Sequence, residues 1–558
     1  MGKEIKDSFK LALAQLNPVV GDLDGNVQKA RAARADAAAQ GADLIAFTEL
    51  FLTGYPLEDL VLKPALQAAA HAAAQDLAGD TSDGGPAVLI GLPWAEGPLV
   101  YNAMALLDAG RIEAVRFKYN LPNYGVFDEK RVFAAGPLAP PLDVRGLLIG
   151  VPVCQDIWCE EACHVLAKAG AELLIVPNGS PYWADKLPER LSVARERVAE
   201  TGLPLAYVNQ VGGQDELVFD GASFVLNADG KRAIQMPAWE VAMVVTDWRR
   251  DREGWRCLPG PLAEIEQGDA ANYLACVTGL RDYVEKNGFP GVVLGLSGGI
   301  DSALCAAMAV DALGASRVHS IMLPYAFTSD ESLKDAADAA AALGMRYDTM
   351  PIHAAVEGLG KSLAAVADGG GTSDTTEENL QSRARGTLLM GLSNKFGPMV
   401  VTTGNKSEVS VGYATLYGDM NGGFNPIKDL YKTQVYALAR YRNHERPKGC
   451  LGPEGPVIPD NIITKAPTAE LKPDQRDQDT LPPYDVLDDI LNCLVELELP
   501  VPAIVARGHA PETVKKIERM LYLAEYKRRQ AAPGVKITAK NFGRDRRYPI
   551  TNKFRERL

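Results

Sequence analysis

The sequence predicts an α/β protein with two domains, and three observations support this prediction. Strand-like apolar runs alternate with alanine-rich helical patterns in both halves of the 558-residue chain. A segment at 251–268 is rich in charges, proline and glycine, which is typical of a linker. A glycine-rich loop joins a strand to a helix at 291–302, in the second half. We therefore expect domains at 1–250 and 269–558.

Composition narrows the class of protein. The chain is 47% hydrophobic and 23% charged, as in ordinary globular proteins, and its net charge of −13 argues against a general nucleic-acid binder. No apolar run approaches the roughly 20 residues that span a bilayer. The N-terminus lacks a signal-peptide core, and the eight cysteines show no disulfide spacing. We expect a cytoplasmic protein with reduced thiols that binds neither nucleic acid nor membranes.

The first half reads as a layered α/β domain with covered sheets. Strands are predicted at 11–17, 42–49, 87–92, 101–107, 147–153, 172–176, 205–208, 222–225 and 241–245, and helices at 26–40, 160–169 and 186–201. Glu49, Lys118 and Cys154 lie at or just beyond strand ends. A cysteine nucleophile needs a proton acceptor and a nearby positive charge. The six histidines lack motif context, so a carboxylate is the better candidate for the proton acceptor and a lysine for the positive charge.

Two other interpretations of the cysteines remain open at this point. A single cysteine at a strand end is more often buried and inert. Cys154, Cys159, Cys163 and His164 are also close in sequence, which could indicate a zinc site. The spacing lacks a Cys-x2-Cys knuckle, and residues from 160 onward are predicted as helix, so zinc is disfavoured.

Residues 10 to about 250 resemble the nitrilase, or carbon–nitrogen hydrolase, superfamily. The resemblance rests on a strand followed by Glu49, on Lys118-x-x-Leu-Pro and on Cys154-x-Asp-x-Trp, in that order. It implies an αββα sandwich in which Glu49 is the general base, Cys154 the nucleophile and Lys118 the oxyanion stabiliser. It also implies a supporting role for Glu129 and glutamine binding by Tyr124 and Ser180.

The second half opens on Ser297-Gly-Gly-Ile-Asp-Ser302 between a strand and a helix. Gly298 and Gly299 let the backbone approach a phosphate, and the helix N-terminus directs N–H groups at it. Asp301 has the wrong charge for a phosphate unless a divalent cation lies between them, and Glu408 could share that cation. No lysine follows the glycines, so this is not a Walker A loop. A plain strand-to-helix turn is the alternative, but the sequence resembles the SGGxDS loop of ATP-pyrophosphatase ligases.

The loop at 297–302 is followed, in order, by polar segments at 378–385, 398–408, 417–432 and 465–471. Together these five segments give residues 270–558 a resemblance to the NAD synthetase domain. Alternation of strands and helices in this half predicts a doubly wound parallel sheet. With the nitrilase-like half in front, the whole chain resembles the glutamine-dependent NAD⁺ synthetases. The resemblance implies ATP contacts at Ser297, Gly298, Gly299, Asp301, Ser302, Arg385, Thr403 and Thr468. It implies deamido-NAD⁺ contacts at Asn379, Asp419 and Lys428, and a Mg²⁺ site at Asp301 and Glu408.

By this resemblance, ATP adenylates the nicotinate carboxylate of deamido-NAD⁺, and ammonia from glutamine displaces AMP. A homo-oligomer that channels ammonia is expected, with ATP and Mg²⁺ as co-substrate and cofactor. An amidase fused to another adenylating ligase, such as one that makes GMP, is disfavoured by the segments 417–432 and 465–471. A non-catalytic metabolite sensor would not need the thiol or the carboxylates.

The C-terminal residues 527–557 carry eleven Lys and Arg against two acids, in contrast to the acidic chain. A solvated basic tail is the simplest explanation. The mixture of glycine, aromatic and basic residues at 542–553 would also suit docking on a dinucleotide phosphate or on a partner subunit.

Overall fold

The computed structural model describes residues 7–364, 375–473 and 475–556. The chain forms two compact units, Met1–Gln214 with Val218–Glu266, and Asp215–Leu217 with Gln267–Leu558. Within the segment predicted as a linker, residues Gly254–Cys257 form the edge strand β15, and Trp255 and Cys257 are buried. The first helix of the second unit, α5, begins at Gly268.

The first unit contains two large sheets. The seven-stranded sheet has the order β15-β14-β1-β2-β3-β4-β5, with β14 at Ala242–Asp251, β1 at Ser8–Gln15, β2 at Leu44–Ala46, β3 at Ala87–Glu96, β4 at Leu99–Asp108 and β5 at Arg111–Phe117. The six-stranded sheet has the order β13-β12-β9-β8-β7-β6, with β13 at Arg232–Gln235, β12 at Phe224–Leu226, β9 at Leu205–Asn209, β8 at Leu173–Asn178, β7 at Leu147–Gly150 and β6 at Leu142–Val144. A separate hairpin pairs β10 (Val211–Gln214) with β11 (Leu217–Asp220).

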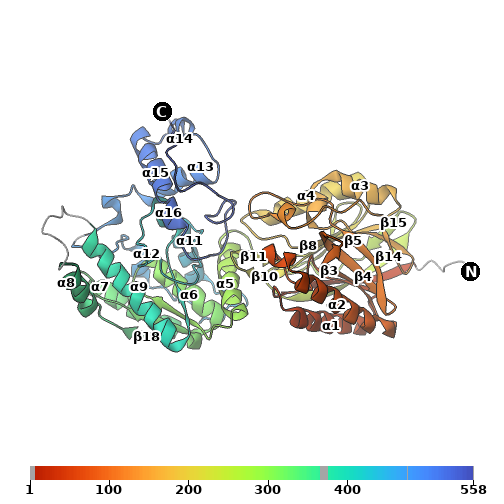
Figure 1. The fold of residues 1–558 in the computed structure, drawn as a ribbon, viewed down its shortest axis with the longest axis horizontal. Helices are drawn as coiled ribbons and strands as arrows, with labels where there is room; N and C mark the ends of the chain where they lie inside the picture. Colours follow the sequence, from red (N-terminus) through yellow and green to blue (C-terminus); the bar gives the residue numbers. More distant parts are fainter. Residues whose placement is uncertain (1–6, 365–374, 474, 557–558) are drawn as a thin grey trace, which may run out of the picture. The chain divides into compact units, whose positions relative to one another are not determined.

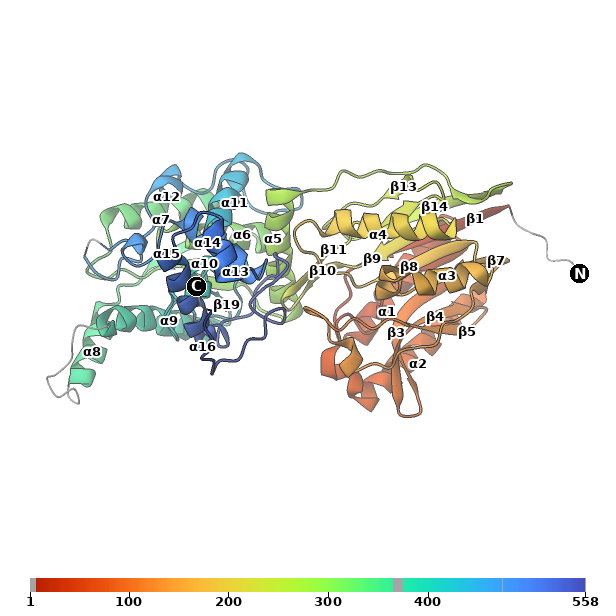
Figure 2. The same ribbon diagram turned by 90° about the horizontal axis from the view of Figure 1, so that it is seen from above.

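Strand β1 shows how the layers form. Its residues alternate between two cores: Leu11 and Leu13 pack against the other sheet, whereas Ala12 and Ala14 pack against helices. Helices α1 (Leu23–Ala39) and α2 (Pro64–Asp80) cover the seven-stranded sheet, while α3 (Glu160–Lys168) and α4 (Lys186–Thr201) cover the other. Figure 1 shows this order of layers, and Figure 2 shows α4 lying over β8 and β9. This arrangement confirms the predicted αββα sandwich.

The second unit is built around a four-stranded parallel sheet of order β18-β17-β16-β19. Its strands are β16 at Val292–Gly295, β17 at Val318–Met322, β18 at Arg346–Thr349 and β19 at Met399–Val401. The chain runs outward from β16 to β18 and then returns to place β19 on the other side of β16. In open parallel sheets, ligands bind at such a reversal, outside the carboxyl ends of the strands. The predicted doubly wound sheet is confirmed, and its reversal lies at the loop that follows β16.

Helices surround this sheet and extend beyond it. They are α5 at Gly268–Lys286, α6 at Ile300–Leu313, α7 at Asp330–Leu343, α8 at His353–Ala364, α9 at Thr376–Phe396, α10 at Lys406–Val411, α11 at Lys432–His444, α12 at Asp460–Thr464, α13 at Tyr484–Val495, α14 at Val501–Ala506, α15 at Pro511–Leu523 and α16 at Glu525–Arg528. Helices α13 to α15 share a core with α10 and gather near the C-terminus (Figure 1).

The basic C-terminal segment folds onto the second unit. Asp429 Oδ2 accepts hydrogen bonds from the backbone N–H groups of Ile537 (2.8 Å) and Thr538 (2.7 Å). The buried ring of Phe542 lies under the Arg528 and Arg546 guanidinium groups, at 4.7 and 5.8 Å. The burial of these residues does not fit a solvated tail for this part of the segment.

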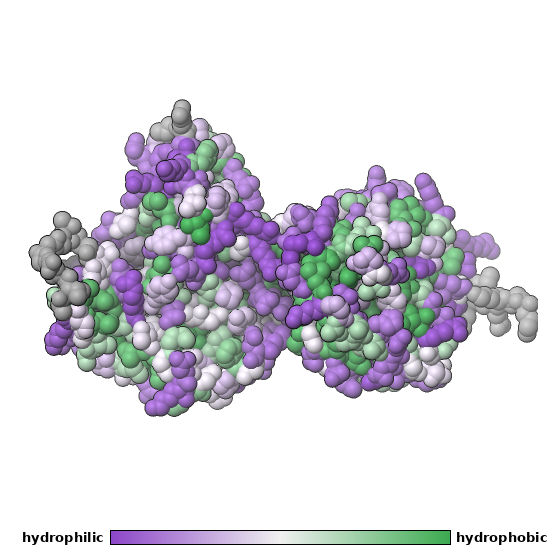
Figure 3. All heavy atoms as spheres, viewed as in Figure 1, coloured by the Kyte–Doolittle hydropathy of each residue, from purple (hydrophilic) through white to green (hydrophobic). Residues whose placement is uncertain are grey.

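The visible surface is mixed in polarity. On the face drawn in Figure 3, hydrophobic residues are interspersed with hydrophilic ones on both units. Among the helices of the described residues, none combines the length and the apolar character needed to cross a membrane.

Candidate active sites

Glu49 follows β2 and is completely buried at the centre of a polar cluster in the first unit. Its Oε1 accepts hydrogen bonds from Lys118 Nζ and Asn102 Nδ2, both at 2.7 Å, and its Oε2 accepts one from the Gly179 N–H at 2.9 Å. Strand β3 passes so close that a Cβ on Gly91 would lie 2.2 Å from a backbone nitrogen of the Glu49 loop. The carboxylate is therefore held on both oxygens by three separate strands or loops.

Lys118 follows β5, and its Nζ lies between two carboxylates. Glu49 Oε1 is 2.7 Å away and Glu129 Oε2 is 2.8 Å away. Burial opposes the charged form of Lys118, but Glu129 and Glu49 outweigh it and raise its pKa well above the ordinary value. Burial also raises the pKa of Glu129 to about 7, although Lys118 partly offsets it. The Tyr55 hydroxyl donates to Glu129 Oε1 at 3.0 Å and fixes its orientation.

Cys154 begins a 3₁₀ helix, Cys154–Trp158, with a left-handed backbone φ of 45°. Asp156 holds this turn by accepting the Val153 N–H at 2.9 Å, and it also accepts the Tyr119 and Asn120 N–H groups just after Lys118. Asp156 thus fastens the cysteine turn to the lysine loop. A strained nucleophile position supported by such bonds is typical of active sites.

The surroundings of the Cys154 thiol disfavour its ionised form. Burial raises its pKa well above the ordinary value, and Glu49, which hydrogen-bonds to the thiol, adds to this effect, while Lys118 opposes it. A neutral thiol beside a carboxylate needs deprotonation when it attacks, and Glu49 lies in position to accept that proton. The structure therefore brings together Glu49, Lys118, Glu129 and Cys154, which are far apart in the sequence.

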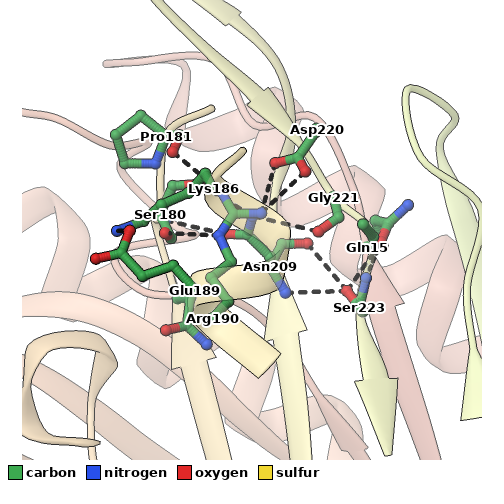
Figure 4. A network of polar contacts seen from close by, with 12 residues as sticks. Gln15, Ser180, Pro181, Lys186, Glu189, Arg190, Asn209, Asp220, Gly221 and Ser223 are labelled. Atoms are coloured by element: carbon green, nitrogen blue, oxygen red, sulfur yellow. Dashed lines mark hydrogen bonds and ion pairs between the residues drawn. The ribbon is translucent and has the colours of Figure 1, made fainter. Parts of the chain in front are cut away.

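The two residues predicted to bind glutamine differ in exposure. Ser180 is buried, and its backbone N–H donates to Asn209 Oδ1 at 2.9 Å (Figure 4). Tyr124 is 52% exposed and donates to Gln155 Oε1 at 2.9 Å, next to the nucleophile in sequence.

Lys186 is a further candidate site residue that the sequence did not predict. Its Nζ lies 4.0 Å from the ring centroid of Trp158 and 3.7 Å from that of Trp183, and it pairs with Glu189 at 2.9 Å. Burial lowers the pKa of Lys186 to about 8, although Glu189 works against this change. The sequence offered one signal for Lys186, because this lysine lies three residues after Trp183 and six after Ser180. Asn102, in the middle of an ordinary strand pattern, gave no such signal.

A pocket of about 490 Å³ lies at the strand reversal of the second unit. Most predicted site residues of this unit line it: Ser297, Gly299, Asp301, Ser302, Asn379, Arg385, Thr403, Glu408, Asp419 and Thr468. Gly298 has φ +79°, and a Cβ there would meet the backbone oxygen of Ser332 at 2.5 Å. Only glycine fits that position without moving the loop, because both the space and the backbone conformation exclude a side chain.

Asp301 and Glu408 face each other in this pocket across Lys432. Lys432 Nζ lies 2.5 Å from Asp301 Oδ2 and 3.2 Å from Glu408 Oε1. Asn405 Nδ2 donates to the other oxygen of Asp301 at 2.9 Å. Burial raises the pKa of Glu408, while Lys432 opposes that change. Two carboxylates that converge on one cation are the oxygen donors that Mg²⁺ prefers, so these residues fit a magnesium site.

Lys432 is the last residue of the segment 417–432, but the sequence did not predict it as a site residue. Lys428, which was predicted, does not line the pocket; it is buried and pairs with Glu216 at 3.2 Å in the same compact unit. The predicted contact of Lys428 with deamido-NAD⁺ stays a prediction. Arg385 is held by one bond from its Nε to the Leu323 carbonyl at 2.9 Å, and burial lowers its pKa to about 10.

Comparisons with known proteins assign a family to each half of the chain. A carbon–nitrogen hydrolase family model matches residues 10–255, and an NAD synthase model matches residues 273–531. The glutamine-dependent NAD⁺ synthetase of Rhodobacter capsulatus is 53% identical over 558 residues, covering 99% of both chains. That of Acinetobacter baylyi is 44% identical over 554 residues, covering 98% of this chain and 99% of the relative.

Solved structures give the same result. The glutamine-dependent NAD⁺ synthetase of Acinetobacter baumannii, in complex with ADP, is 44% identical and matches with a TM-score of 0.77, covering 99% of this chain and all of that one. A Cytophaga hutchinsonii structure, only 22% identical, shares the fold with a TM-score of 0.82. The chain therefore belongs to the glutamine-dependent NAD⁺ synthetases, ATP-dependent ligases that take their amide nitrogen from glutamine.

Proposed function

We propose that Glu49, Lys118 and Cys154 carry out the glutaminase half of this reaction. Glu49 accepts the thiol proton as the sulfur attacks the side-chain amide carbon of glutamine. Lys118 stabilises the oxyanion that forms, and the intermediate collapses to a thioester as ammonia leaves with the proton from Glu49. Water then hydrolyses the thioester to glutamate. The observation that carries this proposal is the buried Lys118 ammonium, which bonds Glu49 and Glu129 next to the thiol.

Glutamine also presents an α-carboxylate and an α-ammonium group. We assign the α-carboxylate to Lys186 and Ser180, because Lys186 is a buried cation in the chain segment that follows Ser180. Tyr124, at the exposed side next to Gln155, contributes a further polar contact with glutamine.

In the second unit, the proposed ATP site is the loop formed by Ser297, Gly298, Gly299, Asp301 and Ser302, together with Arg385, Thr403 and Thr468. Asn379 and Asp419 are proposed contacts for deamido-NAD⁺, with Lys428 as a more distant candidate. The nicotinate carboxylate attacks the α-phosphorus of ATP, pyrophosphate leaves, and ammonia then displaces AMP. Mg²⁺ held by Asp301 and Glu408 would neutralise charge on the phosphate oxygens. The support is that Asp301, which belongs to the glycine loop, and Glu408 line the same pocket and both contact Lys432.

Ammonia must reach the adenylate unprotonated, because ammonium is not a nucleophile. We therefore also propose that it is channelled rather than released to bulk water, in a homo-oligomer that works in the cytoplasm. Light scattering on the purified protein would measure its oligomeric state. A strictly monomeric, fully active enzyme would refute the oligomer.

The test of the two-site proposal measures NAD⁺ formation with glutamine and with ammonium chloride separately. Cys154→Ala should abolish the glutamine-supported rate and retain the ammonia-supported rate. Asp301→Ala should abolish both. Cys159→Ala is a matched control, because Cys159 is an exposed free thiol that lies five residues after Cys154, directly after the 3₁₀ helix. Equal loss of both rates in Cys154→Ala would contradict two separate sites.

A further inference from the structure

Arg190 on α4 is a buried cation that the glutaminase proposal does not use. Its guanidinium is completely buried, and its Nη1 donates to both oxygens of Asp220, at 2.7 and 2.9 Å (Figure 4). Its Nη2 donates to the carbonyls of Ser180 (2.8 Å) and Pro181 (3.0 Å), and its Nε donates to Ser180 Oγ (3.0 Å). Every nitrogen of the guanidinium therefore has a hydrogen-bond partner.

The hydrogen bonds of Arg190 fix the backbone of residues 179–181, which has two roles. Asn209 also holds this segment, because its Oδ1 accepts the Ser180 N–H and its Nδ2 donates to the Ser180 carbonyl at 3.0 Å. The preceding N–H, that of Gly179, donates to Glu49 Oε2. The same fixed backbone therefore supports the proposed general base and presents the Ser180 hydroxyl.

The direction of the bond from Arg190 to Ser180 limits what Ser180 can do. A guanidinium N–H can only donate, so Ser180 Oγ must accept. The one hydroxyl hydrogen of Ser180 then points to a different acceptor. The buried Tyr207 hydroxyl, which makes no hydrogen bond of good geometry within the described residues, is one candidate in the protein, and an oxygen of the substrate is the other.

We propose that Arg190, paired with Asp220, is a positioning residue that makes Ser180 a hydrogen-bond donor to the α-carboxylate of glutamine. This inference rests on the proposed glutaminase function. The amide oxygen of glutamine is already directed at Lys118 in that proposal, so the α-carboxylate is the acceptor that remains. Arg190 thereby selects amides that carry a carboxylate, although it touches no substrate atom itself.

The experiment measures ammonia release from three amides: glutamine, glutaramate, which lacks the α-ammonium group, and 4-aminobutanamide, which lacks the α-carboxylate. Arg190→Lys keeps the charge but loses the fork of donors. It should raise KM about tenfold for glutamine and for glutaramate, since a tenfold change corresponds to about 1.4 kcal/mol, one hydrogen bond to a charged group. KM for 4-aminobutanamide should not change.

Further variants separate positioning from general damage. Ser180→Ala should give the same selective rise, and the double variant with Arg190→Lys should be no worse than Ser180→Ala alone, because both act on one bond. Arg190→Gln with Asp220→Asn removes the charged pair without leaving a buried charge alone, and it should also raise KM selectively. Arg195→Lys, exposed on the same helix, is the control.

Three results would overturn the inference. One is a KM rise that is equal for all three amides in Arg190→Lys and Ser180→Ala. Another is an unchanged KM for glutamine in both variants. The third is a rise in Tyr207→Phe as large as in Ser180→Ala, which would show that Ser180 works through Tyr207. If the wild-type enzyme released no ammonia from glutamine, the proposed glutaminase itself would fail, and the two failures are thus distinguishable.

Discussion

Replacing Lys432 by methionine tests whether its ammonium holds the pocket of the second unit together. The Lys432 side chain is 3% exposed, and the side chains of Asp301 and Glu408 are 17% and 18% exposed. Lys432→Met would leave two neighbouring carboxylates without the cation that they share. Removal of one partner from a buried ion pair costs about 3–5 kcal/mol, and partial exposure of the acids favours the lower end.

The expected shift in melting temperature follows from that free energy. With the usual unfolding entropy of about 2.1 cal/mol/K per residue, a unit of this size loses roughly 1.6 °C in Tm per kcal/mol, so a loss of about 3 kcal/mol predicts a decrease of about 5 °C. Differential scanning calorimetry in the presence of EDTA would measure this decrease in Tm. The transition of the second unit is identified as the one that added ATP shifts. Added Mg²⁺ should recover part of the loss, because a cation held by Asp301 and Glu408 replaces the missing charge.

Lys334→Met is the matched control for this measurement. Lys334 pairs with Asp338 one turn along α7, but its side chain is 75% exposed, so its removal should leave Tm unchanged. If Lys432→Met lowered Tm no more than this control, the ammonium would not be what holds the two carboxylates.

The remaining predictions concern the glutaminase and the glycine loop. Glutamine hydrolysis should fall as the pH drops through about 7, because Glu129 takes up a proton there and no longer balances Lys118. Tyr55→Phe should move this step to higher pH, since its hydroxyl lowers the pKa of Glu129; a step at the same pH would contradict this. Gly179→Ala should reduce glutamine hydrolysis at least 100-fold while ammonia-supported synthesis persists, because the added Cβ would lie 2.6 Å from the Tyr55 ring and displace the N–H that binds Glu49. Gly298→Ala should abolish ATP binding, measured by calorimetric titration, because its Cβ would meet the Ser332 backbone at 2.5 Å; the helical Gly360→Ala, with open space around it, should bind ATP as before.

The sequence determined the features that depend on residues close together in the chain. Strand, glycine loop and helix start follow one another within 291–302, so the fold around that loop could be predicted from local pattern alone. The layered sandwich and the parallel sheet followed from alternating strands and helices, and both were confirmed. The family, and with it the overall reaction, followed from the order of the motifs and was confirmed by relatives over the full chain.

Only the tertiary structure determined which polar and charged side chains form hydrogen bonds and ion pairs with one another. Asn102 bonds Glu49 across 53 positions of sequence, and Lys432 reaches Asp301 across 131. Neither contact can be predicted from the local sequence, because a strand or helix pattern indicates which face is buried but not which residues pack against that face. The pairing of Lys428 with Glu216, outside the pocket lining, is likewise a contact that no local pattern indicates, and the substrate contact that the resemblance implies for Lys428 stays a prediction. Burial makes these pairings strong, and only the folded chain determines which charges are buried together.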